Sequence, residues 1–72
     1  MSDAENHTYK VIEVIGSSHV SWEDAAQKVI AQASKTLKDL RIAEVKELDC
    51  KIENGKITAY RTKLHLSFRF HD

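Results

Sequence analysis

The sequence predicts an α+β fold, in which a three-stranded antiparallel sheet curls around one helix in the order strand, helix, strand, strand. In segment 21–40 the apolar residues recur every three or four positions, which is typical of an amphipathic helix. Segments 9–15, 42–53 and 60–70 carry the apolar alternation or the β-branched residues of strands. An Asn-Gly pair between the last two segments indicates a hairpin.

The composition indicates a single domain, 9–72, behind a polar N-terminal tail, 1–8. Eleven basic residues balance eleven acidic ones, so the net charge predicts neither nucleic acid nor an anionic membrane as a partner. No apolar run approaches the ~18 residues of a membrane span, and the first ten residues are too polar for a secretory signal. We therefore expect a cytoplasmic protein that keeps its one cysteine, Cys50, reduced.

The first strand, 9–15, carries apolar residues on both faces, as a covered strand does, and we expect Gly16 to end it. Ser21 followed by Asp24 resembles a capping box, with Asp in place of the usual Glu, and predicts a helix from there to about Leu40. The apolar stripe of this helix comprises Trp22, Ala25, Ala26, Val29, Ala33, Leu37 and Leu40.

The second strand, 42–53, places its apolar residues at odd positions in its first half and at even positions in its second half. A bulge near Lys46 and Glu47 would reconcile the two phases. Asn54 and Gly55 are residues that tolerate the positive φ of a type I′ turn. We therefore expect the second and third strands to pair antiparallel, with the third strand in the centre of the sheet.

In the third strand, 60–70, residues suited to a buried face alternate with polar or charged residues without exception. The strand spans roughly 35 Å. A chain this small is marginal alone, and its cysteine and histidine spacing offers neither a disulfide nor a zinc site. We therefore expect an obligate oligomer in which the dry face of this strand is buried between subunits. The dry face comprises Tyr60, Thr62, Leu64, Leu66, Phe68 and Phe70, and the charged face Arg61, Lys63, His65, Ser67 and Arg69.

Four stretches of the chain, 9–18, 25–26, 43–45 and 60–69, carry a family resemblance through their order and spacing. Together they resemble the dodecins, small proteins whose twelve copies form a hollow shell. The resemblance covers nearly the whole chain and implies a homododecamer with ligand pockets between subunits. It implies storage or sequestration of a small molecule without catalysis, the ligand being flavin (riboflavin or flavin mononucleotide, FMN) in the family at large.

The resemblance also implies four ligand-binding positions: Ile42, Asp49, Arg61 and Arg69. Flavin-binding dodecins stack the flavin on a tryptophan at the position of Ile42, and a branched aliphatic side chain cannot reproduce that stack. They bind the edge of the flavin with a glutamine at the position of Arg61. Glutamine both donates and accepts hydrogen bonds, whereas arginine only donates them. Arg69 matches the family, whereas Asp49 replaces an arginine that meets the flavin phosphate in some relatives. The four positions therefore argue against the family's ordinary mode of flavin binding.

A flavin-free structural or cation-binding assembly is the second hypothesis, because one calcium-binding branch of the dodecins lacks the stacking tryptophan. Carboxylate oxygens suit calcium, and the candidate ligands are Glu44, Glu47 and Glu53, with Asp49 and Asp72 nearby in the pattern. The alternative interpretation of these acids is a solvated charge ladder. Its basic partners would be Lys46, Lys51, Arg61 and Lys63.

The remaining reactive side chains indicate no catalytic site, since neither a nucleophile beside a base nor a phosphate-cradling glycine loop is apparent. Trp22 is interpreted as a core or interface residue away from the ligand pocket, and Cys50 as a small buried apolar group. His65 and His71 share a strand face but lie about 20 Å apart, too far to bind one metal ion within a chain.

Overall fold

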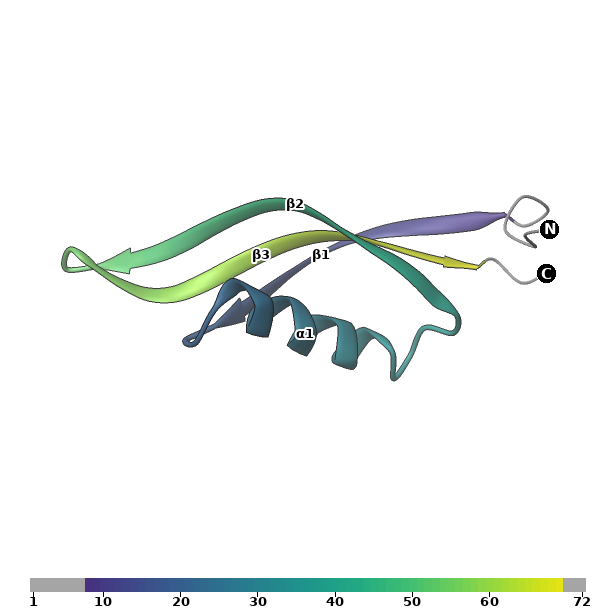
Figure 1. The fold of residues 1–72 in the computed structure, drawn as a ribbon, viewed down its shortest axis with the longest axis horizontal. Coiled ribbons are helices and arrows are strands. Elements are labelled where there is room, and N and C mark those ends of the chain that lie inside the picture. Colours follow the sequence, from purple (N-terminus) through teal and green to yellow (C-terminus); the bar gives the residue numbers. More distant parts are fainter. Residues whose placement is uncertain (1–7, 70–72) are drawn as a thin grey trace.

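The computed structural model describes residues 8–69 and contains one helix packed on one face of a sheet (Figure 1). The elements are β1 (Tyr9–Ser18), α1 (Trp22–Ala33), β2 (Leu40–Glu53) and β3 (Lys56–Arg69). The sheet has the order β1-β3-β2, and β3 is antiparallel to both neighbours. The predicted fold class and the central position of the third strand are confirmed.

Residues 1–7 and 70–72 lie outside the described part of the chain. The predicted tail, the place of Phe70 on the dry face and the roles considered for His71 and Asp72 therefore stay predictions. Within residues 8–69, no helix is long and apolar enough to cross a membrane.

Strand β1 continues through Gly16 to Ser18, so the prediction that Gly16 ends the strand was wrong. Gly16 pairs with Thr62 in the ladder. A Cβ atom at residue 16 would lie 2.3 Å from the carbonyl oxygen of Ala25 and 3.2 Å from Cβ of Val29. The glycine is needed because the backbone of α1 lies directly against the strand at this point.

Helix α1 begins as predicted. Ser21 is the N-cap in an extended conformation, and its Oγ accepts a hydrogen bond from the backbone N–H of Asp24 at 2.9 Å. The Asp24 carboxylate accepts a hydrogen bond from Ser18 at 2.5 Å and lies 3.1 Å from Nζ of Lys28. These two contacts, the Ser18 bond first, lower the pKa of Asp24 below its ordinary value. The carboxylate thus ties the end of β1 to the first turn of the helix.

The helix ends at Ala33, well before the predicted end near Leu40, which was wrong. The chain turns after Ala33, whose carbonyl accepts the backbone N–H of Leu37 at 2.8 Å. Asp39 then adopts a left-handed φ of 58°, and Leu40 enters β2 opposite Phe68. The apolar spacing continues past the end of the helix because two further leucines also line the space under the sheet. Leu37 does so from the turn after the helix, and Leu40 from the start of β2.

The β2–β3 hairpin has the predicted bulge and turn. Its register shifts between Val45 and Glu47, which leaves Lys46 as the extra residue. Asn54 and Gly55 have φ values of 52° and 74°, as a type I′ turn requires. Both strands begin earlier than predicted, and the hairpin extends past the N-terminal end of α1 (Figure 1).

The core of the subunit is small. Among residues 8–69 its buried apolar side chains are Ala25, Ala59, Leu64 and Leu66. Helix α1 packs against β1 and β3, so these two leucines are buried inside the subunit. The prediction that the dry face of the third strand is buried between subunits was therefore wrong at Leu64 and Leu66.

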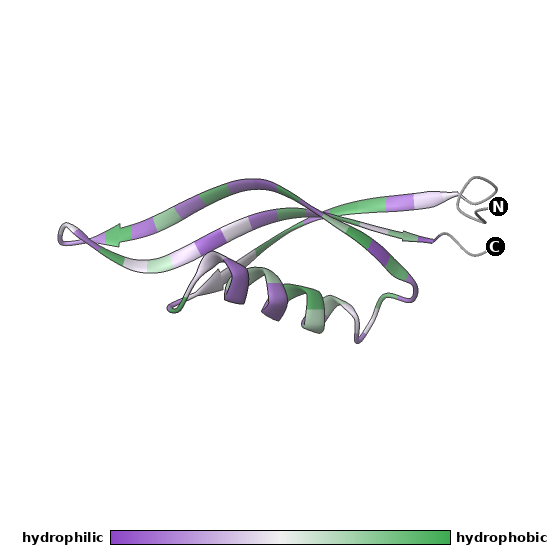
Figure 2. Cartoon of the chain, in the orientation of Figure 1, coloured by the Kyte–Doolittle hydropathy of each residue, from purple (hydrophilic) through white to green (hydrophobic). Residues whose placement is uncertain are grey.

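Much apolar surface remains outside this core. The chain measures 51 × 21 × 18 Å, and its radius of gyration of 14.6 Å exceeds the about 11 Å of a compact chain of this length. Apolar residues recur along the whole of β2, including the hairpin beyond the helix (Figure 2). The large apolar side chains that are exposed are Val11, Ile15, Val20, Ile42, Val45, Leu48, Ile52 and Ile57.

Candidate functional site

The sheet face opposite α1, here called the outer face, carries the candidate ligand residues. The residues of this face are identified from the alternation of side chains along β3. Its buried residues Thr62, Leu64 and Leu66 point toward the helix, so their neighbours point to the outer face. Directly paired residues of adjacent strands point to the same side of a sheet, so the register defines cross-strand rows. The rows are Ser17–Arg61–Asp49, Ile15–Lys63–Glu47, Glu13–His65–Glu44 and Val11–Ser67–Ile42.

Acidic side chains flank the basic column of β3 on both sides. Nζ of Lys63 lies 3.1 Å from Glu47 and 3.8 Å from Glu13. The hydrogen bond to Glu47 is the main reason that the pKa of Lys63 is raised. Nε2 of His65 lies 3.4 Å from Glu13. The solvated charge ladder is therefore present, and Glu13 on β1 is a member that the sequence analysis missed.

Asp49 and Arg61 form the best-defined pair on the outer face. Nε and Nη2 of Arg61 donate to Oδ1 and Oδ2 of Asp49 at 2.7 and 2.8 Å. This two-point hydrogen bonding lowers the pKa of Asp49 and raises the pKa of Arg61. Both groups therefore stay charged at neutral pH, and the guanidinium of Arg61 already holds an oxyanion.

Trp22 connects the backbone of this pair to the helix, and whether it lies away from the ligand pocket stays a prediction. Its Nε1–H donates to the backbone carbonyl of Asp49 at 3.0 Å. Its ring meets the ring of Tyr60 edge-on, with centroids 5.1 Å apart and an interplanar angle of 74°. The carbonyl of Trp22 also accepts the hydroxyl of Thr62 at 2.9 Å. A lone tryptophan at the helix start was the available signal, but its partner on β2 depends on the register.

The four ligand positions do not meet within one subunit. Ile42 pairs with Ser67, six residues along β3 from Arg61, which corresponds to about 20 Å. Arg69 lies near the Ile42 end of β3, and its backbone N–H donates to Asp39 at 3.1 Å. The structure thus separates the Asp49–Arg61 pair from the pair of positions Ile42 and Arg69.

The proposed metal ligands are also apart. Glu44 and Glu53 lie opposite His65 and Lys56, about 30 Å from each other along β3. Each lies 3.5 Å from a lysine of its own strand, Lys46 for Glu44 and Lys51 for Glu53. In the described residues, no three His, Cys, Asp or Glu side chains lie close enough to hold a metal ion. A site built from Glu44, Glu47 or Glu53 would therefore need carboxylates from a second copy.

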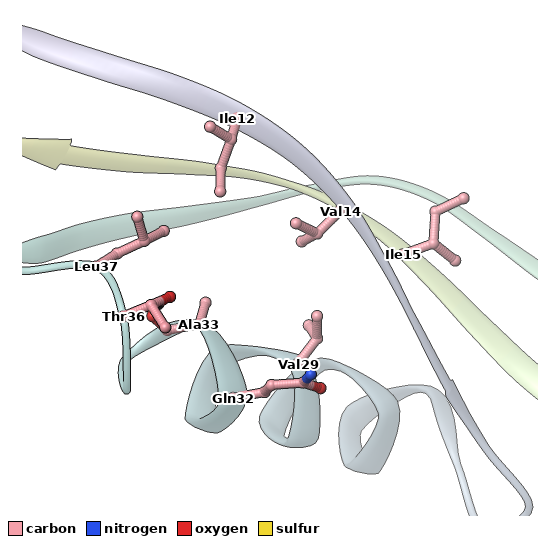
Figure 3. A pocket seen from close by; sticks show the side chains of 8 residues that line it. All are labelled: Ile12, Val14, Ile15, Val29, Gln32, Ala33, Thr36 and Leu37. Carbon is pink, nitrogen blue, oxygen red and sulfur yellow. Dashed lines mark hydrogen bonds between the residues drawn. The ribbon is translucent and has the colours of Figure 1, made fainter.

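An open apolar groove lies on the other side of the sheet, between α1 and β1 (Figure 3). Its volume is about 540 Å³, and the side chains of Val14 and Val29 face each other across it. The groove is not predictable from the sequence, because it depends on how far the helix lies from the strand. Its lining residues are Ile12, Val14, Ile15, Val29, Gln32, Ala33, Thr36 and Leu37.

Cys50 lies on the helix side of β2, opposite Tyr60, and is half-buried with a free thiol. The prediction of a buried apolar group is therefore met only in part. The thiol is no part of the outer face.

Comparison with known proteins gives one family. The family model described as Dodecin matches residues 8–71. The calcium dodecin of Mycobacterium tuberculosis is 47% identical over 62 residues, which cover 85% of this chain and 86% of that protein. A solved structure of a calcium dodecin from Mycobacterium tuberculosis, described as a calcium chelating immunodominant antigen with a novel calcium-binding site, has 43% identity and a TM-score of 0.80. The match covers 89% of this chain and 91% of the other.

A dodecin from Streptomyces coelicolor has a similar fold, with a TM-score of 0.88 and 36% identity over 93% of this chain and 96% of the other. This chain therefore belongs to the dodecin family and resembles its calcium-dodecin branch.

Proposed function

We propose that this chain assembles into a closed homo-oligomer of twelve copies that sequesters a small molecule between subunits, in the cytoplasm, and catalyses no reaction. The observation that carries the proposal is the apolar surface of β2, where Ile42 is 64% exposed and Ile52 is 65% exposed. A subunit with four buried apolar side chains in residues 8–69 has too small a core to persist alone. We take the covering partners to be copies of the same chain, because most soluble oligomers are closed homo-oligomers.

The separation of the ligand positions supports a pocket between subunits. Ile42 and Arg61 lie about 20 Å apart on one chain, which is more than a small ligand spans while touching both. Closed symmetry can place Ile42 of one copy beside Arg61 of another. The relatives' names describe calcium chelation or the family itself and no reaction, which agrees with a binding role.

Native mass spectrometry of freshly purified protein tests this proposal, because it reports subunit number and retained ligand mass together. We expect twelve subunits and a retained small molecule that is released on denaturation. Monomers or dimers at micromolar concentration would contradict the proposal. Twelve subunits that carry only cations would favour the second candidate.

The second candidate is a flavin-free assembly that binds calcium. Carboxylate oxygens on the outer face support it, because Glu44 and Glu47 lie on exposed positions of β2 where a second copy could add the further oxygen ligands that calcium needs. The 47% identity to the calcium dodecin of Mycobacterium tuberculosis also supports this candidate. Calorimetric titration of the chelator-treated protein with calcium, with magnesium as the control, tests this candidate. Equal weak heats for both ions would argue against a calcium site.

The substitutions at the flavin positions give a testable prediction. We expect Ile42→Trp combined with Arg61→Gln to raise the affinity for riboflavin by about tenfold or more. The tryptophan supplies the missing stack, and glutamine supplies the missing acceptor. Flavin fluorescence quenching measures the affinity, and riboflavin is used because it carries no phosphate.

The matched control is Ile57→Trp, which adds the same ring at another exposed isoleucine of the hairpin, 53% exposed. It should leave riboflavin binding as it is in the parent protein. An unchanged affinity of the double variant, in an intact assembly, would show that other parts of the pocket decide.

A further inference from the structure

We propose that Asp49 is a specificity-determining residue, which occupies the guanidinium of Arg61 and so keeps phosphate groups off the outer face. This inference deepens the proposed function, because it concerns the class of ligand that the outer face accepts. It predicts that neutral or cationic molecules are preferred over phosphorylated ones.

The geometry of the pair supports this role. Arg61 uses Nε and Nη2, one edge of its planar group, for two parallel hydrogen bonds of 2.7 and 2.8 Å to the two oxygens of Asp49. A phosphate or a ligand carboxylate binds arginine through the same two-point arrangement. Asp49 therefore stands in the place of an anionic ligand, and such a ligand must first displace it.

The pair is more fixed than an ordinary surface ion pair, in which both long side chains must be ordered for little gain. Asp49 and Arg61 are directly opposite in the ladder, so their backbones are already in register. The Trp22 indole holds the carbonyl of Asp49 at 3.0 Å and packs edge-on against Tyr60, the neighbour of Arg61. The start of the helix thus anchors both strands beside the pair.

The surroundings show what Asp49 prevents. Lys63 points to the same face two residues from Arg61, about 7 Å away. Ser17 lies opposite Arg61 on β1. Lys63 keeps its contacts with Glu47 at 3.1 Å and Glu13 at 3.8 Å whether or not Asp49 is present. Without the Asp49 carboxylate, the guanidinium of Arg61 alone would lose its anionic partner, and an arginine in that state binds phosphate through two parallel hydrogen bonds. Arg61 and Asp49 are about half exposed, so a ligand can reach them.

The test is Asp49→Asn, which keeps the size of the side chain and the backbone bond to Trp22 but removes the charge. We expect the assembled variant to bind inorganic phosphate about tenfold or more tightly than the parent protein does. Isothermal titration calorimetry in a low-salt buffer without other multivalent anions measures this difference. A second readout is the affinity ratio of FMN to riboflavin, which differ only by a phosphate and should shift toward FMN.

Glu47→Gln is the matched control, because it removes one negative charge from the same strand and face but leaves Arg61 occupied. It should give a much smaller gain in phosphate affinity. Asp49→Asn combined with Arg61→Gln should lose the gain of the single variant. Equal gains for Asp49→Asn and Glu47→Gln, or no gain for Asp49→Asn, would overturn the inference.

The outcomes separate this inference from the proposed function. Native mass spectrometry of each variant records the assembly before the titration. An intact dodecamer of Asp49→Asn with unchanged phosphate affinity refutes the role of Asp49 and leaves the storage assembly standing. A parent protein that does not assemble refutes the proposed function, while the phosphate comparison between parent and variants still decides the role of Asp49.

Discussion

Gly16→Ala is expected to lower the free energy of unfolding by about 3 kcal/mol, near the upper end for an overpacked site. The added methyl group would lie 2.3 Å from the carbonyl oxygen of Ala25, which belongs to the backbone of α1 and cannot rotate away. Relief of this contact requires the helix to move off β1, and that movement opens the small core around Leu64 and Leu66. Urea unfolding followed by circular dichroism at a fixed protein concentration measures the loss.

Gly55→Ala is the control, because it adds the same methyl group at the second glycine of the chain. Residue 55 has no atom within 4 Å of the added position, but its φ of +74° disfavours alanine by about 1–2 kcal/mol. We therefore expect Gly55→Ala to destabilise the protein less than Gly16→Ala does. The reverse order would contradict the close approach of α1 to β1.

Leu66→Lys is expected to abolish the folded subunit. Leu66 is 1% exposed under α1, and a lysine there would place a charge in an apolar core with no described carboxylate beside it in the ladder. Loss of an intact leucine side chain from a core costs about 2–5 kcal/mol even without a charge, which is comparable to the whole stability of a small domain. Circular dichroism should show loss of the helix signal, and the protein should become insoluble.

Leu48→Lys gives the comparison, since Leu48 is 52% exposed on β2. If β2 is covered by other copies, this charge should yield smaller soluble species that keep the helix. Native mass spectrometry and circular dichroism on the same samples distinguish the two variants. An intact, helical Leu66→Lys dodecamer would contradict the burial of Leu66 inside the subunit, and an intact Leu48→Lys dodecamer would contradict the covering of β2 at that residue.

Local sequence predicted most of the fold because its signals depend on neighbours along the chain. Ser21 caps the helix through a backbone group three residues away, and Asn54 and Gly55 form their turn by themselves. The phase change of β2 predicted the bulge at Lys46, since a strand has a period of two. The end of the helix was missed because Leu37 keeps the apolar spacing from a turn, and spacing alone does not distinguish a turn from a helix.

The candidate site was less accessible from sequence. The acidic and basic residues of the outer face were identified, but their pairing depends on the register between strands far apart in the sequence. Glu13 and the contact of Trp22 with Asp49 were not predicted for that reason, since each residue meets its partner only after the sheet forms. The separation of Ile42 from Arg61 also follows from the length of β3.

The sequence by itself determined the order of the elements, the hairpin, the bulge and the family, because periodicity, turn residues and motif order are properties of a linear chain. Only the tertiary structure decided that Gly16 lies inside a strand, that α1 covers Leu64 and Leu66 within the subunit, and that Asp49 holds Arg61. Each of these depends on the distance between segments that are remote in sequence. Such distances are fixed by packing and register, which no local pattern encodes.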